Sequence, residues 1–373
     1  MSDGIRCMLM RGGTSKGAYF LADDLPGDRA ERDALLLRIM GSPDPAQIDG
    51  VGGGHPLTSK VAVVAPSADP STDVDYLFLQ VAVDEAVVSD RQTCGNLLAG
   101  VGPFAVERGL VPAADRAKVL IRMVNTGSVA VAEFGAPGGR VEYAGDLAMN
   151  GVPGTAAPIT LTFEGTAGSS TGALLPTGNV RDEVAGVPVT LVDNGMPSVL
   201  MRAADLGVAG TEDPAELEAR PGLAERLLEI RLAAAALMGL PADPSATVPK
   251  LVLLSPARAG GAISTRSFLP VRCHRAIGVL GAVTVGAGIR LPGTVGHDLA
   301  TLPPADAGGT DASGGGEDAG GEDVVTLRIE HPSGYLDVSV ALDLTGPSPT
   351  ATASAAMRTA RKLFDGTVFP RSY

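Results

Sequence analysis

Tryptophan is absent from this 373-residue sequence and aromatic residues make up only 3% of it, so the core has to be built from alanine, valine, leucine and isoleucine. Basic residues are also scarce: 29 Lys and Arg stand against 42 Asp and Glu, and the formal net charge is −13. A chain with this balance has no general attraction for a phosphate backbone, which argues against a nucleic-acid partner. If the substrate is an anion, the positive charge that binds it must be local.

Other absences narrow the class of protein further. Three cysteines are too few for a disulfide framework, and the four histidines show no spacing typical of metal ligands, so no metal site is predicted. No apolar run reaches the roughly 18 residues that a membrane-spanning helix needs. The first residues also lack a basic segment followed by an apolar stretch, the pattern of a signal peptide. These absences predict a cytoplasmic protein with no membrane partner.

What is present is a set of short apolar strands around two nearly uncharged stretches. Residues 97–106 and 278–289 are small, apolar and of helical length, so each is expected to be a helix covered on all sides. A curled sheet around each helix would provide that cover, which predicts an α+β fold with a weak twofold repeat, although periodicity alone does not define the topology. Residues 305–323 are acidic and of low complexity, and they predict a mobile loop.

Cys94 is the first candidate for chemistry because it stands immediately before one of these helices, in the segment Cys94-Gly95-Asn96. A helix N-terminus offers free N–H groups and partial positive charge. A thiol in that position is expected to have a lowered pKa and to exchange protons near neutral pH. A lone cysteine is more often a small core residue, and that alternative stays open.

Lys60 begins an apolar strand, where a lysine is either a solvated strand end or an acid–base group whose pKa is lowered by partial burial. The loop at 11–17 lacks the P-loop pattern, yet its N–H groups and the side chains of Arg11, Thr14 and Ser15 could hold an anion. In the second half, Arg266 stands among apolar residues and predicts a carboxylate partner, either internal or on a substrate. Asn194 precedes a glycine in either a plain turn or a substrate-binding loop.

Together these segments resemble the PrpF family, whose members are isomerases with the diaminopimelate-epimerase-like fold. The motifs are 10–17 (MRGGTSKG), 57–60 (LTSK), 94–96 (CGN), 193–197 (DNGMP) and 265–268 (TRSF), with further matches at 40–44, 172–179 and 331–334. The resemblance covers nearly the whole chain. Within the family it is strongest to the bacterial tautomerases of 4-oxalomesaconate, which act in gallate and protocatechuate degradation.

The resemblance implies two pseudo-symmetric domains, each a barrel-like sheet around a central helix, with the active site in the cleft between them. The expected domains are 1–184 together with 352–373, and 185–351. Racemase relatives of this fold place two cysteines around the substrate. Here the second of these positions falls in 278–281, which contains no cysteine. In the PrpF branch, a lysine matching Lys60 and a cysteine matching Cys94 form the acid–base pair instead.

The implied activity is a tautomerisation of 4-oxalomesaconate, a small tricarboxylate keto acid, by proton transfer without a cofactor. Lys60 and Cys94 would carry the protons. The residues expected to bind the carboxylates and the developing enolate oxygen are Arg11, Thr14, Ser15, Ser59, Gly95, Asn96, Asn194, Arg266, Ser267 and Gly281. Two alternatives remain: 2-methylaconitate cis–trans isomerisation or another PrpF-type isomerisation, and a non-catalytic tricarboxylate-binding protein, which would need neither Lys60 nor Cys94. A homodimer is the assembly considered.

Overall fold

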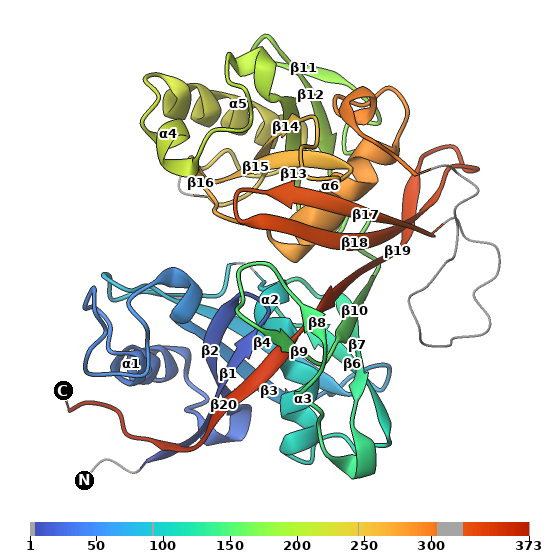
Figure 1. Cartoon of the computed structure of the whole chain (residues 1–373). Coiled ribbons are helices and arrows are strands. Elements are labelled where there is room, and N and C mark those ends of the chain that lie inside the picture. Colours follow the sequence, from blue (N-terminus) through green and yellow to red (C-terminus); the bar gives the residue numbers. More distant parts are fainter. Residues whose placement is uncertain (1–3, 92, 245, 304–323, 373) are drawn as a thin grey trace. The chain divides into compact units, whose positions relative to one another are not determined.

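The computed structural model describes residues 4–91, 93–244, 246–303 and 324–372 (Figure 1). The chain divides into two compact units, Met1–Thr162 with Met357–Tyr373, and Phe163–Ala356. The acidic loop predicted at 305–323 lies outside the described residues.

The first unit is built on one mixed sheet in the order β20-β1-β2-β3-β4-β6-β7-β10. Strands β2 and β3 run parallel, as do β4 and β6, while the pairs β1–β2, β1–β20, β3–β4 and β6–β7 are antiparallel. The strands are β1 (Ile5–Gly12), β2 (Ser15–Leu21), β3 (Lys60–Pro66), β4 (Val74–Val81), β5 (Val88–Ser89), β6 (Arg116–Met123), β7 (Val129–Gly135), β8 (Leu147–Ala148), β9 (Thr155–Ala156), β10 (Ile159–Glu164) and β20 (Ala360–Val368).

Helices cover both faces of this sheet. Helix α1 (Arg29–Met40) begins where the Asp28 carboxylate accepts a hydrogen bond from the Glu31 N–H, and it ends at Gly41, whose φ of 86° closes the last turn. Its apolar side chains join those of β1–β4 in a core cluster that includes Phe20 and Val61. The helices α2 (Gly95–Leu98) and α3 (Val101–Glu107) contact the other face through β1, β2, β3, β6 and β7. Short 3₁₀ turns lie at Ala22–Asp24, Pro56–Thr58 and Pro137–Gly139.

The prediction of a single helix over 97–106 is wrong, because the buried stretch is divided at Gly100 into the two helices α2 and α3. The Leu97 carbonyl accepts the Tyr19 hydroxyl at 2.6 Å and the Gly100 N–H at 2.9 Å, whereas in a continuous α-helix it would accept the N–H four residues further along. A Cβ at Gly100 would lie 2.5 Å from the Tyr19 hydroxyl oxygen, so only glycine fits at this position beside the Tyr19 ring. A contact from a strand far away in the sequence thus interrupts the helix.

The second unit repeats this plan with a longer central helix. Strands β13 and β14 run parallel, as do β15 and β17, and the pairs β12–β13, β14–β15, β17–β18 and β18–β19 are antiparallel. The strands are β11 (Asp182–Val184), β12 (Val187–Val192), β13 (Ser198–Arg202), β14 (Lys250–Ser255), β15 (Ile263–Leu269), β16 (Arg272–Cys273), β17 (Val324–His331), β18 (Gly334–Asp343) and β19 (Thr350–Arg358). The helices are α4 (Pro214–Glu218), α5 (Leu223–Leu237) and α6 (Val279–Arg290), with 3₁₀ turns at Ala203–Leu206 and His297–Leu299.

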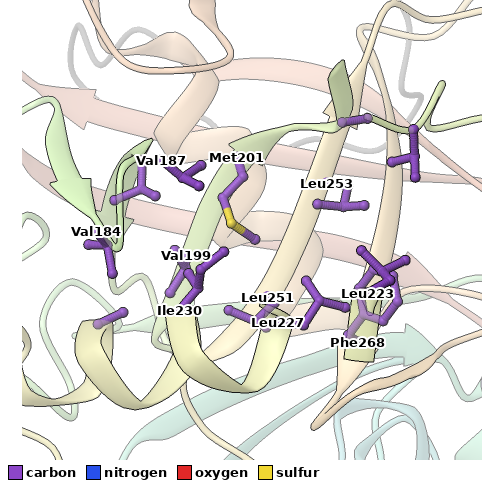
Figure 2. Close-up of a cluster of buried hydrophobic side chains, with 14 of the residues drawn as sticks. Val184, Val187, Val199, Met201, Leu223, Leu227, Ile230, Leu251, Leu253 and Phe268 are labelled. Atoms are coloured by element: carbon purple, nitrogen blue, oxygen red, sulfur yellow. The ribbon is translucent and has the colours of Figure 1, made fainter. Parts of the chain in front are cut away.

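Helix α5 covers one face of this sheet, and α6 contacts β12, β13, β17 and β18. Figure 2 shows Leu251 and Leu253 of β14 and Phe268 of β15 in one apolar cluster with the side chains of α5. Because side chains alternate along a strand, the residues between them, such as Val252 and Ser267, lie on the α6 face. The second buried helix predicted at 278–289 is confirmed, with observed limits one residue further along the chain at each end.

The expected boundary after residue 184 does not coincide with the division of the chain, because residues 163–184 belong to the second unit. Thr166 donates to the Asn194 side-chain oxygen at 2.6 Å, and the Gly168 N–H donates to the Asp193 carbonyl at 2.8 Å. These bonds attach the segment to the turn between β12 and β13. The chain likewise returns to the first unit at Met357 rather than at residue 352, since β19 pairs with β18 as far as Ala356.

Candidate active site

Cys94 is the residue at which α2 begins, and its thiol is half-buried. Its carbonyl accepts the Leu98 N–H at 3.0 Å, the first bond of the helix, and also the Tyr76 hydroxyl at 3.3 Å. No described residue forms a hydrogen bond with its sulfur. The free N–H groups at the start of α2 favour negative charge developing next to them, which suits a sulfur that gives up a proton.

The β1–β2 hairpin closes over the start of α2. The Asn96 side-chain amide donates to the Thr14 hydroxyl at 3.1 Å. Gly13 has a φ of 53°, and a Cβ there would lie 2.3 Å from the Asn96 side-chain oxygen. Glycine at the hairpin tip is therefore required by both conformation and space. The hairpin brings Thr14 to the same helix end as Cys94, Gly95 and Asn96.

Ser15 adds an unsatisfied hydroxyl to this group. Its side chain is 2% exposed, and among the described residues its oxygen has no hydrogen-bond partner. Ser15 and Gly17 share one face of β2, and a Cβ at Gly17 would lie 2.9 Å from a Leu97 methyl carbon, so this face looks toward α2. A buried hydroxyl without a partner costs about 1–3 kcal/mol, which a ligand oxygen would offset.

Lys60 is the first residue of β3 and is 7% exposed. Its ammonium donates to the Gln80 side-chain oxygen at 2.8 Å and lies 5.0 Å from the centroid of the Phe78 ring. Val61 belongs to the cluster packed on α1, so Lys60 points to the opposite face, the one that α2 and α3 cover. No described carboxylate forms an ion pair with this lysine.

Gln80 is a site residue that sequence reasoning missed. Tyr76, Phe78 and Gln80 lie on one face of β4, and this face contacts both candidate acid–base residues. Tyr76 donates to the Cys94 carbonyl, and Gln80 accepts from the Lys60 ammonium. The Gln80 amide group is itself fixed, because it donates to the Ser59 carbonyl at 2.8 Å. The signal in the sequence was a lone glutamine at the end of an apolar strand. The sequence did not show that β3 pairs with β4 and places Lys60 opposite Gln80.

On the edge away from β3, the middle of β4 is held by a side chain rather than by another strand. β4 pairs with β6 only from Val74 to Tyr76 and with β5 only from Gln80 onward. Between these pairings, the Asn125 side chain accepts from the Phe78 N–H and donates to the Phe78 carbonyl, both at 2.9 Å. The amide thus replaces a backbone neighbour at the point where the strand carries the aromatic ring beside Lys60.

Ser59 and Arg11, two predicted substrate contacts, are occupied elsewhere. The Ser59 hydroxyl donates to the Val81 carbonyl at 2.9 Å and accepts from the Gln47 side chain at 2.7 Å. One terminal nitrogen of Arg11 donates to the carbonyls of Gly13 and Thr359. Arg11 precedes Gly12, whose Cβ would meet the Asn96 carbonyl at 2.5 Å, so the Arg11 side chain lies on the sheet face away from α2.

In the second unit, the Asn194 side chain connects separate segments of the chain through hydrogen bonds. It is fully buried, accepts from Thr166, and donates to the Ser354 hydroxyl at 2.9 Å and the Val283 carbonyl at 3.3 Å. Thr284 also donates to its carbonyl at 2.9 Å. Of the two predicted alternatives, these bonds favour the structural turn over the substrate-binding loop, because both donor hydrogens of the amide are engaged.

Arg266 and Ser267 lie on opposite faces of β15. Arg266 donates to the carbonyls of Glu212 and Thr265, and burial lowers the pKa of its guanidinium. No described carboxylate forms an ion pair with it, so the internal acid considered from the sequence is not its partner. Ser267 shares the α6 face, and Gly281 lies in the first turn of α6, a helix that no side chain caps.

The described part of the chain contains no group of three or more His, Cys, Asp or Glu side chains arranged to hold a metal ion. None of its helices has the length and apolarity needed to cross a membrane.

A family model described as PrpF protein matches residues 3–371. The chain belongs to the PrpF family. This PrpF chain is 54% identical over 368 residues to the (4E)-oxalomesaconate Delta-isomerase of Novosphingobium sp. (strain KA1), covering 98% of each chain. It is 52% identical over 365 residues to the 4-oxalomesaconate tautomerase of Pseudomonas putida, covering 98% of this chain and 95% of the relative.

Among solved structures, a methylitaconate-delta-isomerase is similar with a TM-score of 0.79 and 33% identity, covering 98% of this chain and 95% of that one. The expected diaminopimelate-epimerase-like α+β fold is confirmed.

Proposed function

We propose that this PrpF protein is an isomerase that tautomerises 4-oxalomesaconate by proton transfer, with Lys60 and Cys94 as the acid–base pair. The observation that carries the proposal is the single face of β4 that fixes both groups, through Gln80 and Tyr76. The names of the two relatives that are more than half identical support the choice of substrate. The proposal includes action in the cytoplasm, in the degradation of aromatic compounds, without a cofactor.

The substrate carries a C–H bond that is activated by a neighbouring carbonyl and a conjugated alkene. Lys60 in its neutral form takes this proton, and the electron pair moves into a dienolate. A proton then returns at another carbon of the conjugated system, and Cys94 delivers it. The number of protons and electrons is unchanged, so the reaction requires no redox partner. Groups positioned for both transfers contribute typically 10²–10⁴-fold each.

Binding of the carboxylates and of the developing enolate oxygen falls to the donors at the start of α2. The Ser15 hydroxyl is buried without a partner, and Asn96 and Thr14 are already positioned against each other. The first N–H groups of α2, beginning at Gly95, add donors aimed at an anion. In the second unit, Ser267 and Gly281 remain proposed contacts, whereas Arg266 is left out because it lies on the opposite face of β15 and donates to main-chain carbonyls. Ser59 and Asn194 are left out because their side chains are occupied internally.

An absorbance assay of the purified chain tests the proposal. The protein would be mixed with 4-oxalomesaconate and, separately, with 2-methylaconitate, in the presence of EDTA. We expect rapid turnover of the first substrate and little of the second. Turnover of 2-methylaconitate alone would move the protein to another reaction of the family. Tight binding of both compounds without turnover would instead identify a tricarboxylate-binding protein.

A further inference from the structure

A cavity of about 490 Å³ lies in the first unit, outside the group of residues assigned to catalysis. Three of the side chains that line the cavity are cationic: Arg11, Lys16 and Arg361. Apolar side chains, among them Met149 and Leu363, line the remainder, and none of the described residues that line it is acidic. The cavity is therefore positively charged, although the chain as a whole is acidic.

The three cations are direct neighbours across strands. Arg11 on β1 stands opposite Lys16 on β2 and opposite Arg361 on β20. Like charges that face each other across a sheet are destabilising. The pKa of Arg11 is lowered by burial and, next, by the charge of Arg361. The repulsion is therefore built into the register of three adjacent strands.

No carboxylate in the described part of the chain relieves this repulsion. Arg11 donates to two main-chain carbonyls, and within the described chain neither Lys16 nor Arg361 forms a hydrogen bond or ion pair. Other cations of the same unit are paired: Arg108 with Asp365, Arg122 with Asp75, and Lys362 with Glu107. The chain has 42 acidic residues, yet none of the described residues that line the cavity is acidic, whereas these other cations of the unit each have a carboxylate partner.

We propose that this cavity is a second ligand site, which binds a small organic polycarboxylate. Two or more carboxylates match three adjacent cations, and guanidinium groups bind carboxylates through paired hydrogen bonds. The apolar walls suit a carbon skeleton better than an inorganic ion. Arg361 is exposed, whereas Arg11 and Lys16 are half-buried, so the ligand enters from solvent past Arg361.

The second site is separate from the acid–base pair. Neither Lys60 nor Cys94 lines the cavity, and its strand cations lie on the sheet face away from α2. The two sites nevertheless share the β1–β2 hairpin: Arg11 donates to the Gly13 carbonyl, and Thr14 is bonded to Asn96. Gly151, which precedes the lining residue Val152, also lies near the hairpin, since a Cβ at Gly151 would lie 3.3 Å from a Thr14 methyl carbon. Occupancy of the cavity therefore steadies the hairpin that faces the substrate.

Calorimetric titration of citrate, used as a tricarboxylate probe, into the full chain tests this proposal. We expect two citrate sites per chain in the wild type. In Arg361→Gln, the affinity of one site should fall by about 10- to 100-fold, the change that loss of one charge-assisted hydrogen bond produces, while the other site is kept. Arg116→Gln is the matched control, because Arg116 is an exposed arginine on β6 that does not line the cavity.

Thermal unfolding supplies an independent readout. Without ligand, Arg361→Gln should melt at the wild-type temperature or above it, because one repulsive charge is gone. With citrate, the wild type should gain more than the variant, and sodium chloride at equal ionic strength controls for screening. Inorganic phosphate should give a smaller gain than citrate. Identical citrate isotherms for the wild type and Arg361→Gln would overturn the proposal. Loss of all citrate binding together with turnover would also overturn it, since the cavity would then be the substrate site itself.

Discussion

Each unit carries one buried lysine at the same point of its topology. Lys60 begins β3, which runs parallel to β2 and antiparallel to β4; Lys250 begins β14, which runs parallel to β13 and antiparallel to β15. Both side chains lie on the face that the central helix covers, and they are 7% and 8% exposed. Their surroundings differ. Lys60 has the Gln80 oxygen and an aromatic face, whereas the Lys250 ammonium has no hydrogen-bond partner among the described residues.

The comparison separates a buried lysine whose ammonium is held by a side-chain acceptor from one that is only enclosed. Burial and, next, the charge of Arg231 lower the pKa of Lys250 to about 7. No hydrogen bond to a described residue fixes the direction of its ammonium. At Lys60, a neutral acceptor fixes the nitrogen without adding charge. The residues that precede the central helices also differ, since Cys94 precedes α2 whereas Gly278 precedes α6.

The largest effect is expected from Lys60→Met. Loss of the base should reduce exchange of the carbon-bound protons of the substrate with deuterium by at least about 10²–10⁴-fold, measured by NMR. Lys60→Arg should fail equally, because a guanidinium is not deprotonated in proteins. Lys118→Met, at an exposed lysine on β6, is the control. The same substitution at Lys250 should leave exchange largely intact; an equal loss there would mean that the two lysines share the task.

Cys94→Ala should fold normally and lose activity by about 10²–10⁴-fold. Cys273→Ala in the second unit is the matched control. Burial raises the pKa of Cys273 to about 12, and the pKa of Cys7 likewise, so both thiols stay protonated and unreactive near neutral pH. Iodoacetamide followed by peptide mass analysis should therefore modify Cys94 first, and substrate should slow that reaction. Wild-type turnover in Cys94→Ala would remove this thiol from the mechanism.

Lys250→Met should stabilise the protein by a few kcal/mol at and below pH 7, at about 1.4 kcal/mol per unit of pKa difference. The folded-state pKa lies below the unfolded one, so between about 7 and 10.5 the unfolded chain binds more protons, and wild-type stability rises with pH. The gain from Lys250→Met should shrink across that window. Urea unfolding at pH 6 and pH 9.5 measures it, and an equal gain at both pH values would show that proton binding is not the cause.

Gln80→Leu should produce the smallest of these effects, a loss of about tenfold in kcat with little change in KM, because it removes an orienting partner rather than a reacting group. Gln80→Glu is the sharper variant. A carboxylate would hold the Lys60 ammonium in its charged form, so the rising limb of the pH–rate profile should move to higher pH. An unchanged profile in Gln80→Glu would show that the 2.8 Å contact does not act on the proton transfer.

Local signals sufficed for some elements and failed for others. Helix α6 was predictable because its stretch is uniformly small and apolar, whereas the break at Gly100 depends on Tyr19, about eighty residues earlier, and no local pattern contains it. The opposite directions of Arg266 and Ser267 were available from strand alternation, since neighbours on a strand cannot share a face. Asn194 was ambiguous because its partners, Thr166, Val283 and Ser354, are scattered over the second unit.

The two hydrogen bonds between the Asn125 side chain and the Phe78 main chain have a consequence for self-association. An uncovered N–H and carbonyl in the middle of a strand form a docking point for a strand of another molecule, the usual start of edge-to-edge aggregation. Here one amide side chain satisfies both groups, and it also donates to the Asp90 carbonyl at 2.8 Å, which ties it to the end of the β5 segment. The strand that carries Phe78 and Gln80 is thus closed to foreign strands at its centre without any further strand being added to the sheet.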